Sequence, residues 1–171
     1  MLLLVMFSIA ARYQDDPAHP RPTDGSMWGA GDDYLTAAKR LLDRSFAASR
    51  PSTCKALLLL GYREIGIGAM AHAWTYTGMA IRMAQDLGMH KRADRWTRVG
   101  SPLFNARALQ ERRRIWYACV LMDKYVSTYI GRPVSISERD FDTLLPSTSE
   151  VSTSKICIGS GRRNADVASC A

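Results

Sequence analysis

The fold of this chain is decided by the stretch ERRRIWYACVLMDKYVSTYIGRP, residues 111–133. Apolar side chains recur in it at spacings of three and four residues, the spacing that places them on one face of an α-helix. The pattern extends back to Ala106 and predicts one long helix that ends at about Ile130. Gly131 and Pro133 follow, and both residue types end helices.

The same periodicity upstream predicts four more helices. They cover about residues 2–13, 32–46, 52–68 and 69–87. We expect Asp32 or Asp33 to cap the second helix, and Ser52 or Thr53 to cap the third. Together with the long helix they predict an all-α fold, an irregular multi-helix bundle of about five helices. The segments between residues 91 and 106 and after residue 133 are expected to be loops or short helical stretches.

The inward faces of two helices can be listed from this spacing. The second helix is expected to bury Leu35, Ala38, Leu41, Leu42 and Phe46. The fourth is expected to bury Met70, Trp74, Thr77, Ile81 and Ala84.

The two ends of the chain differ in character. MLLLVMFSIAA, residues 1–11, is too short to span a bilayer, which takes about 20 residues, and no positive charge precedes it as in a signal peptide. We therefore interpret it as a buried helix. Residues 147–171 contain many small polar residues without a sustained period, which predicts a disordered tail after a domain of residues 1–146.

The charge of the chain invites a nucleic-acid interpretation. The net charge is +7 over 171 residues, and basic surfaces attract phosphate. The densest basic run is Arg112-Arg113-Arg114, but successive residues on a helix point about 100° apart. We therefore expect a solvated helix start with one arginine turned inward, and no phosphate-binding face.

The cysteines and histidines do not form a metal-binding pattern. Zinc sites usually bring their ligands in closely spaced pairs, and no such pair occurs here. The four cysteines and three histidines are Cys54, Cys119, Cys157, Cys170, His19, His72 and His90. We expect Cys54 and Cys119 to pack as small apolar side chains inside helices, and we expect neither a metal site nor a disulfide framework.

No catalytic motif is present, so we predict that the chain is not an enzyme. A thiol–imidazole pair of Cys119 and His72 is the one alternative, and packing of both residues in helices is the preferred interpretation. Asp140 and Asp142 lie two residues apart in a loop-like segment, where solvated surface carboxylates explain them.

Asp123 is the polar exception on the apolar side of the long helix. A buried carboxylate needs a partner, because an unpaired buried charge costs several kcal/mol. Arg82 and Arg132 are the candidates. Either these groups form part of a ligand pocket or switch, or they form an ion pair that locks the two long helices and the turn after them. We favour the lock.

Three segments give the chain a resemblance to a known family. They are ALLLLGYREIGIGAMAHAWTYTGMAIRMAQDLGMHK at 56–91, ERRRIWYACVLMDKYVSTYIGRP at 111–133 and FDTLLP at 141–146. In this order they resemble the middle homology region of the fungal binuclear zinc-cluster transcription factors, and MLLLVMFSIAARY is similar to that region's first apolar helix.

The resemblance implies an all-helical regulatory domain of a nuclear transcription factor, here partial and within residues 1–146. Zinc and DNA contact would belong to a separate cluster of six cysteines, which this chain lacks. Implied partners are other proteins or family members, with a small-molecule inducer in some members and no membrane. The matching motif positions imply structural or regulatory roles for Arg82, Arg114, Trp116, Asp123, Gly131, Arg132 and Pro133.

Two alternatives stay open at this point. The family's domain normally continues into further helices, so the chain is expected to be a fragment or the product of a shortened gene model. It could instead be a free-standing helical interaction module that sequesters a full-length factor.

Overall fold

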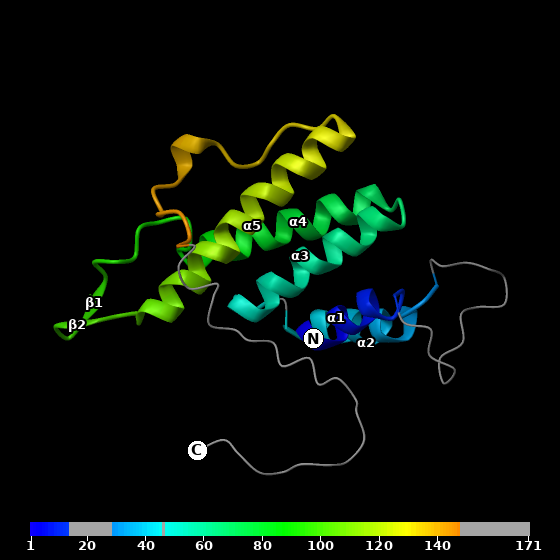
Figure 1. Ribbon diagram of the computed structural model, residues 1–171, viewed down its shortest axis with the longest axis horizontal. Helices are drawn as coiled ribbons and strands as arrows, with labels where there is room; N and C mark the ends of the chain where they lie inside the picture. The colour runs from blue at the N-terminus through cyan, green and yellow to red at the C-terminus, as the bar shows by residue number, and fades with distance from the viewer. Residues whose placement is uncertain (14–28, 46, 148–171) are drawn as a thin grey trace, which may run out of the picture.

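Five α-helices make up most of the part that the computed structural model describes, residues 1–13, 29–45 and 47–147 (Figure 1). The helices are α1 (Leu2–Ala10), α2 (Asp32–Ser45), α3 (Pro51–Gly66), α4 (Met70–Asp86) and α5 (Ala106–Ile130). Between α4 and α5 lies a small hairpin of β1 (Thr97–Arg98) and β2 (Ser101–Pro102), and the short 3-10 helix η1 (Glu138–Asp140) follows α5. The predicted all-α fold is confirmed.

The helices pack as a central group of three with a pair beside it. α3 and α4 are joined by a short connection and lie side by side, and α5 packs across both of them (Figure 1). α1 and α2 pack against each other, and α1 also contacts α3. The β1–β2 hairpin extends from one end of this group, and the chain after α5 turns back along the helix (Figure 1).

The core lies where α3, α4 and α5 meet. Leu57 and Leu60 from α3, Ile81 from α4 and Trp116 from α5 are fully buried, and Ile136 from the segment after α5 joins them. Four consecutive leucines at 57–60 face several sides of α3, and three of them are buried while the fourth is half-buried. Burial of one such side chain stabilises the fold by about 1.5–3 kcal/mol.

The ends of α5 follow from its sequence. The Asn105 side chain accepts a hydrogen bond from the amide of Ala108 at 2.8 Å, which caps the first turn. At the other end Gly131 adopts the left-handed conformation with φ of 72°, where a side chain would be strained. The predicted bounds of this helix are confirmed.

The start of α3 differs from the prediction. Arg50 occupies the N-cap position without a side-chain cap, and Pro51 is the first helical residue. Proline suits that position because its missing N–H would have no partner there and its φ is already helical. The prediction that Ser52 or Thr53 caps this helix was therefore wrong.

Some expected inward positions are exposed. α2 buries Leu35, Ala38 and Leu42, but Leu41 is 40% exposed, because it lies beside the face that these three residues form. Trp74 on α4 is likewise 39% exposed. Phe46, expected to face inward, lies outside the described residues.

Helix α1 is apolar on all sides, but only one of its faces is packed against other helices. It buries Val5 and Ser8 and leaves Leu3, Met6 and Phe7 exposed, so the predicted buried helix is buried on one face. No described helix combines the length and the apolar character that crossing a bilayer requires. The predicted tail of residues 147–171 lies outside the described residues except for Ser147.

The hairpin contains the one strained non-glycine residue among those described. Arg98 pairs with Ser101, so Val99 and Gly100 form the two-residue turn. Both have positive φ, 51° at Val99 and 76° at Gly100, which is the geometry of a type I′ turn. A β-branched side chain is disfavoured at positive φ, and Val99 is 98% exposed, so no packing compensates it.

Replacing Val99 by asparagine should therefore stabilise the fold. Asparagine tolerates the left-handed conformation that costs other side chains about 1–2 kcal/mol, so Val99→Asn is expected to raise the free energy of unfolding by about 1 kcal/mol. Chemical denaturation measures this, with Val134→Asn as a control at an exposed valine of ordinary φ. Equal or lower stability of Val99→Asn would show that the turn is not strained.

Candidate functional site

The buried carboxylate of Asp123 organises the end of α5. Asp123 is only 2% exposed. Its oxygens accept hydrogen bonds from the amide of Ser135, at 3.1 and 2.8 Å, and from the amide of Ile136, at 2.9 Å. Hydrogen bonds to a charged acceptor are stronger than neutral ones, and they replace the water that the carboxylate loses on burial. Asp123 therefore holds the returning chain against its own helix.

The predicted partners of Asp123 were wrong. Among the described residues, no ion pair joins this carboxylate to Arg82 or to Arg132. Arg82 is exposed and makes a 3.4 Å contact with Gln85, and the guanidinium of Arg132 lies over the ring of Trp74. The donors come instead from the backbone, because the turn after Gly131 brings two amides to the carboxylate. The lock joins α5 to the segment after it and does not join the two long helices.

The turn itself is held by short-range bonds. The amide of Arg132 donates to the carbonyl of Ser127 at 2.9 Å, and the hydroxyl of Ser127 donates to the carbonyl of Pro133 at 3.3 Å. Further along, Ile136 is 1% exposed and anchors the segment in the core. We refer to residues 131–136 as the Asp123 turn.

A groove of about 570 Å³ lies beside this turn. That volume falls in the range of small-molecule sites, about 300–1,000 Å³. Its walls come from the connection before α3, from α4 and from the Asp123 turn: Ser49, Trp74, Thr75, Gly78, Met79, Arg82, Met83, Asp86 and Ser135. The Arg132 guanidinium lies 4.6 Å from the centre of the Trp74 ring, so it contacts a residue of the groove wall. Ser135 belongs both to the groove and to the Asp123 lock.

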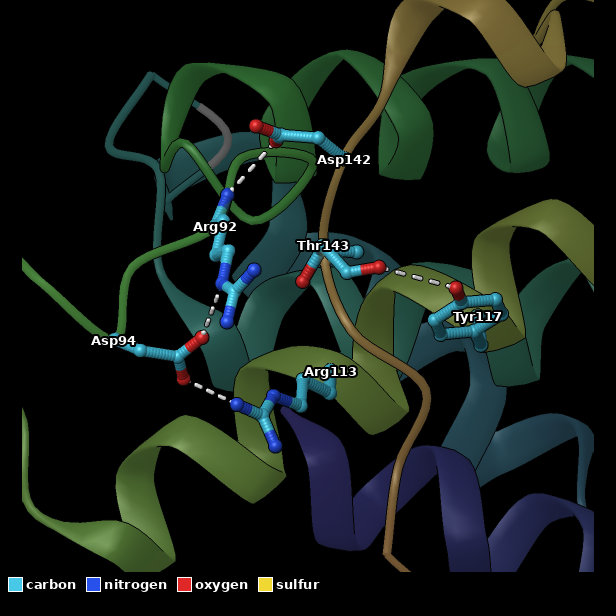
Figure 2. Close-up of polar contacts among 6 residues, drawn as sticks. All are labelled: Arg92, Asp94, Arg113, Tyr117, Asp142 and Thr143. Atoms are coloured by element: carbon cyan, nitrogen blue, oxygen red, sulfur yellow. Dashed lines mark hydrogen bonds and ion pairs between the residues drawn. The ribbon is translucent and has the colours of Figure 1, made fainter.

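Residues 141–147, which we call the strap, cross α5 at its other end (Figure 2). The hydroxyl of Tyr117 donates to the carbonyl of Thr143 at 3.2 Å. Asp142 accepts from the amide of Arg92 at 2.9 Å, and its own amide donates to the carbonyl of His90 at 3.1 Å. The strap thus ties the loop after α4 to α5.

The acidic residues of this region have structural partners that the sequence did not reveal. Asp142 holds the loop through Arg92, and Asp140 forms a capping box with Ser137 at η1. Asp94 bridges Arg92 and Arg113 (Figure 2). The interpretation of Asp140 and Asp142 as merely solvated was incomplete, because their partners are backbone amides.

Under the strap lies an aromatic cluster centred on Trp116. The Trp116 ring is fully buried, with the His90 ring at 5.7 Å and the Phe141 ring at 5.6 Å between centroids. Burial, followed by the charge of Lys91, lowers the pKa of His90, and Asp142 opposes the shift only partly. Burial against Trp116 therefore favours the neutral form of the imidazole.

The three consecutive arginines point in different directions, as predicted. Arg112 is buried between the rings of Trp96 and Phe104 and donates to the carbonyl of Leu87 at 2.7 Å. Arg113 is half-buried and pairs with Asp94, and Arg114 is exposed. Two of the three are thus engaged within the fold, and the run does not present one basic face.

The cysteines pack in the core. Cys54 and Cys119 are fully buried free thiols with their sulfurs 4.0 Å apart, and Cys54 lies within 3.3 Å of the carbonyl of Ala80. The hydrogen bond with Cys54, together with burial, raises the pKa of the Cys119 thiol. The expected packing of both cysteines is confirmed. Cys119 contacts Cys54, whereas the imidazole of His72 lies 3.7 Å from Glu64.

Within the described parts of the chain, no group of three or more histidine, cysteine, aspartate or glutamate side chains could hold a metal ion.

Comparison of the sequence with known protein families identifies one match. The model of the fungal specific transcription factor domain matches residues 1–160. The chain belongs to this family.

Its relatives are transcriptional regulators. The nitrogen assimilation transcription factor nit-4 of Neurospora crassa is 36% identical over 135 residues, which cover 77% of this chain and 12% of the relative. An uncharacterized transcriptional regulatory protein of Schizosaccharomyces pombe is 34% identical over 118 residues, covering 69% of this chain and 19% of the relative. A Zn(2)-C6 fungal-type transcription factor of Fusarium oxysporum f. sp. lycopersici is 31% identical over 149 residues, which cover 85% of this chain and 14% of the relative.

The chain thus spans less than a fifth of the length of each of these relatives. No solved structure matches it.

The seven residues that the family resemblance singled out lie in three places. Five surround the Asp123 turn and the groove: Arg82, Asp123, Gly131, Arg132 and Pro133. Trp116 lies in the cluster under the strap, and Arg114 lies on the exposed side of α5. Sequence reasoning did not single out Ser135 or Ile136, because their contribution is a backbone amide.

Removing the charge of Asp123 should destabilise the whole fold. In Asp123→Asn one oxygen becomes an amide donor that faces backbone N–H groups, so buried donors lose their acceptor. We expect the free energy of unfolding to fall by about 1–3 kcal/mol, measured by chemical denaturation. The control Asp43→Asn, at an exposed carboxylate, should change stability by less than about 0.5 kcal/mol. Equal stability of Asp123→Asn and the wild type would contradict the lock.

The lowered pKa of His90 predicts a pH dependence of stability. Because the folded pKa lies below its ordinary value of 6.5, the unfolded chain binds the proton more readily. Stability due to this group is complete above pH 6.5 and is lost as the pH falls toward the folded pKa. His90→Gln should therefore show a smaller loss of unfolding free energy than the wild type between about pH 7.5 and 5.5.

Lys91→Gln provides the graded comparison for that experiment. It removes the second cause of the shift and leaves the burial, so its loss of stability should lie between those of the wild type and His90→Gln. Identical pH profiles for the wild type and His90→Gln would show that His90 does not contribute.

Proposed function

We propose that this chain acts as the regulatory domain of a nuclear zinc-cluster transcription factor and tunes the activity of a DNA-binding module outside it. The family match and the naming of a relative as a Zn(2)-C6 factor support this. The chain has four cysteines in all, too few for a cluster of six. Zinc and DNA contact would therefore belong to another part of the factor.

The observation that carries a regulatory role is the sharing of Ser135. This residue lines the groove and donates its amide to Asp123. A molecule in the groove would touch the same segment that the buried carboxylate holds to α5. This region would be the regulatory site, with Arg82 in the groove wall, Arg132 on the Trp74 ring, and Gly131 and Pro133 in the turn. Trp116 would stabilise the opposite end of α5. Arg114 would present an exposed charge.

The proposal contains no catalytic step. The free thiols of Cys54 and Cys119 are buried against each other, and a nucleophile must reach both a base and a substrate. The partners we propose are other proteins, including family members, and a small molecule in the groove. The similarity to named regulators favours this role over a free-standing interaction module.

A reporter experiment tests the regulatory role. The full chain is placed between a heterologous DNA-binding domain and an activation domain, and reporter output is measured in the nucleus of a fungal host. We expect the chain to lower output, and Asp123→Asn to restore it by at least about fivefold, the lower range of regulatory coupling.

The exposed variant Asp43→Asn serves as the matched control and should behave as the wild type. Protein levels are measured in parallel, so that loss of the protein is separated from loss of restraint. Unchanged output with and without the chain, at equal protein levels, would overturn the proposal.

A further inference from the structure

No close contact within the described chain requires glycine at position 78, in the middle of α4. A side chain built at Gly78 would meet nothing within 4 Å. Gly61 of α3 is different, since a side chain there would come within 3.0 Å of the Thr77 hydroxyl. Glycine in a helix interior costs about 1 kcal/mol relative to alanine. Gly78 lines the groove, and no described atom occupies the space that its side chain would take.

Two guanidinium groups without a carboxylate partner lie at the groove, one in its wall and one on the ring of a wall residue. Arg82 lines the groove and makes only the 3.4 Å contact with Gln85. Arg132 rests on the Trp74 ring. Of the described acidic side chains, none forms an ion pair with either arginine. Asp86 is the single acid in the groove wall, so Arg82 and Asp86 balance and the neighbouring Arg132 adds one positive charge.

The rest of the wall is largely apolar. It includes the exposed edge of Trp74 and the thioethers of Met79 and Met83. Indole rings stack on planar groups, and methionine side chains adapt to ligands of varied shape. An apolar body of small-molecule size therefore matches the floor of the groove, and an anion matches its rim.

We propose that this groove binds a small amphipathic carboxylate, with its apolar body over Trp74 and Met79 and its carboxylate on the guanidinium groups of Arg82 and Arg132. Guanidinium pairs with carboxylate through two parallel hydrogen bonds, which gives the site selectivity for that group. The inference deepens the proposed regulatory role, on which its biological meaning rests, because it states what class of molecule would control the site.

A neighbouring apolar helix is the competing occupant. Small residues such as Gly78 allow a helix to approach closely, but such a helix would leave two guanidinium groups against an apolar surface, where unpaired charge is costly. The positive rim therefore favours the carboxylate.

Titration calorimetry with the full chain tests the proposal. The probe is phenylbutyrate, which has an aromatic ring, a short apolar linker and a carboxylate, and the comparison is its uncharged amide, phenylbutyramide. We expect the carboxylate to bind at least about tenfold more tightly, since a hydrogen-bonded charge pair is worth about one order of magnitude in affinity. Arg82→Gln and Arg132→Gln should each weaken its binding at least about fivefold.

Two further variants separate specific binding from other causes. Gly78→Leu adds an apolar side chain in the groove wall at a position where a Cβ meets nothing within 4 Å, so it should abolish binding and leave the melting temperature unchanged or higher. Arg114→Gln removes an exposed charge of α5 outside the groove and should bind phenylbutyrate as the wild type does.

The proposal is overturned if the acid and the amide bind equally, which would mark an apolar docking surface, or if Arg114→Gln weakens binding as much as Arg82→Gln. It is also overturned if neither probe binds saturably. Calorimetry does not measure transcription, so the two experiments fail independently. Absence of carboxylate binding would not contradict the reporter result, and an unchanged reporter would not contradict the binding result.

Discussion

The bond between the Asp123 carboxylate and the amides of Ser135 and Ile136 is the constraint on which the rest of the site depends. Carrying an ionised group into the interior costs several kcal/mol unless hydrogen bonds replace its water. Here the cost is offset only when the chain has reversed after Gly131 and lies back along α5. That reversal puts Ile136 into the core and Ser135 into the groove wall. It also fixes the starting point from which the strap runs to the other end of the helix.

The same kind of bond, between a side chain and a backbone group, recurs at three other places in the loops. Arg112 donates to the carbonyl of Leu87 at the end of α4, Tyr117 donates to the carbonyl of Thr143, and Asp142 accepts from the amide of Arg92. Exposed ion pairs contribute about 0–1 kcal/mol each, whereas a buried donor or acceptor left without a partner costs about 1–3 kcal/mol. The loops of this domain are therefore positioned mainly by backbone groups that would otherwise be unsatisfied, and less by pairs of charged side chains.

This explains which features the sequence could predict. Helix α5 was predicted with its bounds because the apolar spacing and Gly131 both depend on residue type. The burial of Asp123 and the inward turn of one arginine followed from the same spacing. The partner of Asp123 could not be predicted, since a backbone amide belongs to every residue type except proline and leaves no mark in the sequence. Leu41 shows the opposite case. Leucine is typical of a core, but Leu41 is 40% exposed, because the way the neighbouring helices pack decides which side chains are buried.

The Arg132–Trp74 contact and the Asp123 turn differ in how easily they can be broken, and this determines how binding in the groove would be transmitted. Arg132 rests on Trp74 through a cation–π contact at an exposed site, worth about 0.5–1 kcal/mol. The Asp123 turn is held by charge-assisted bonds to a buried carboxylate, and breaking it would leave that charge without donors at a cost of about 3–5 kcal/mol. A carboxylate ligand can therefore draw Arg132 away from Trp74 without opening the turn. A ligand shifts an equilibrium only by its differential affinity for two states, so under the proposed binding a weakly bound ligand would first displace Arg132 from Trp74, while the Asp123 turn would keep Ser135 in the groove wall.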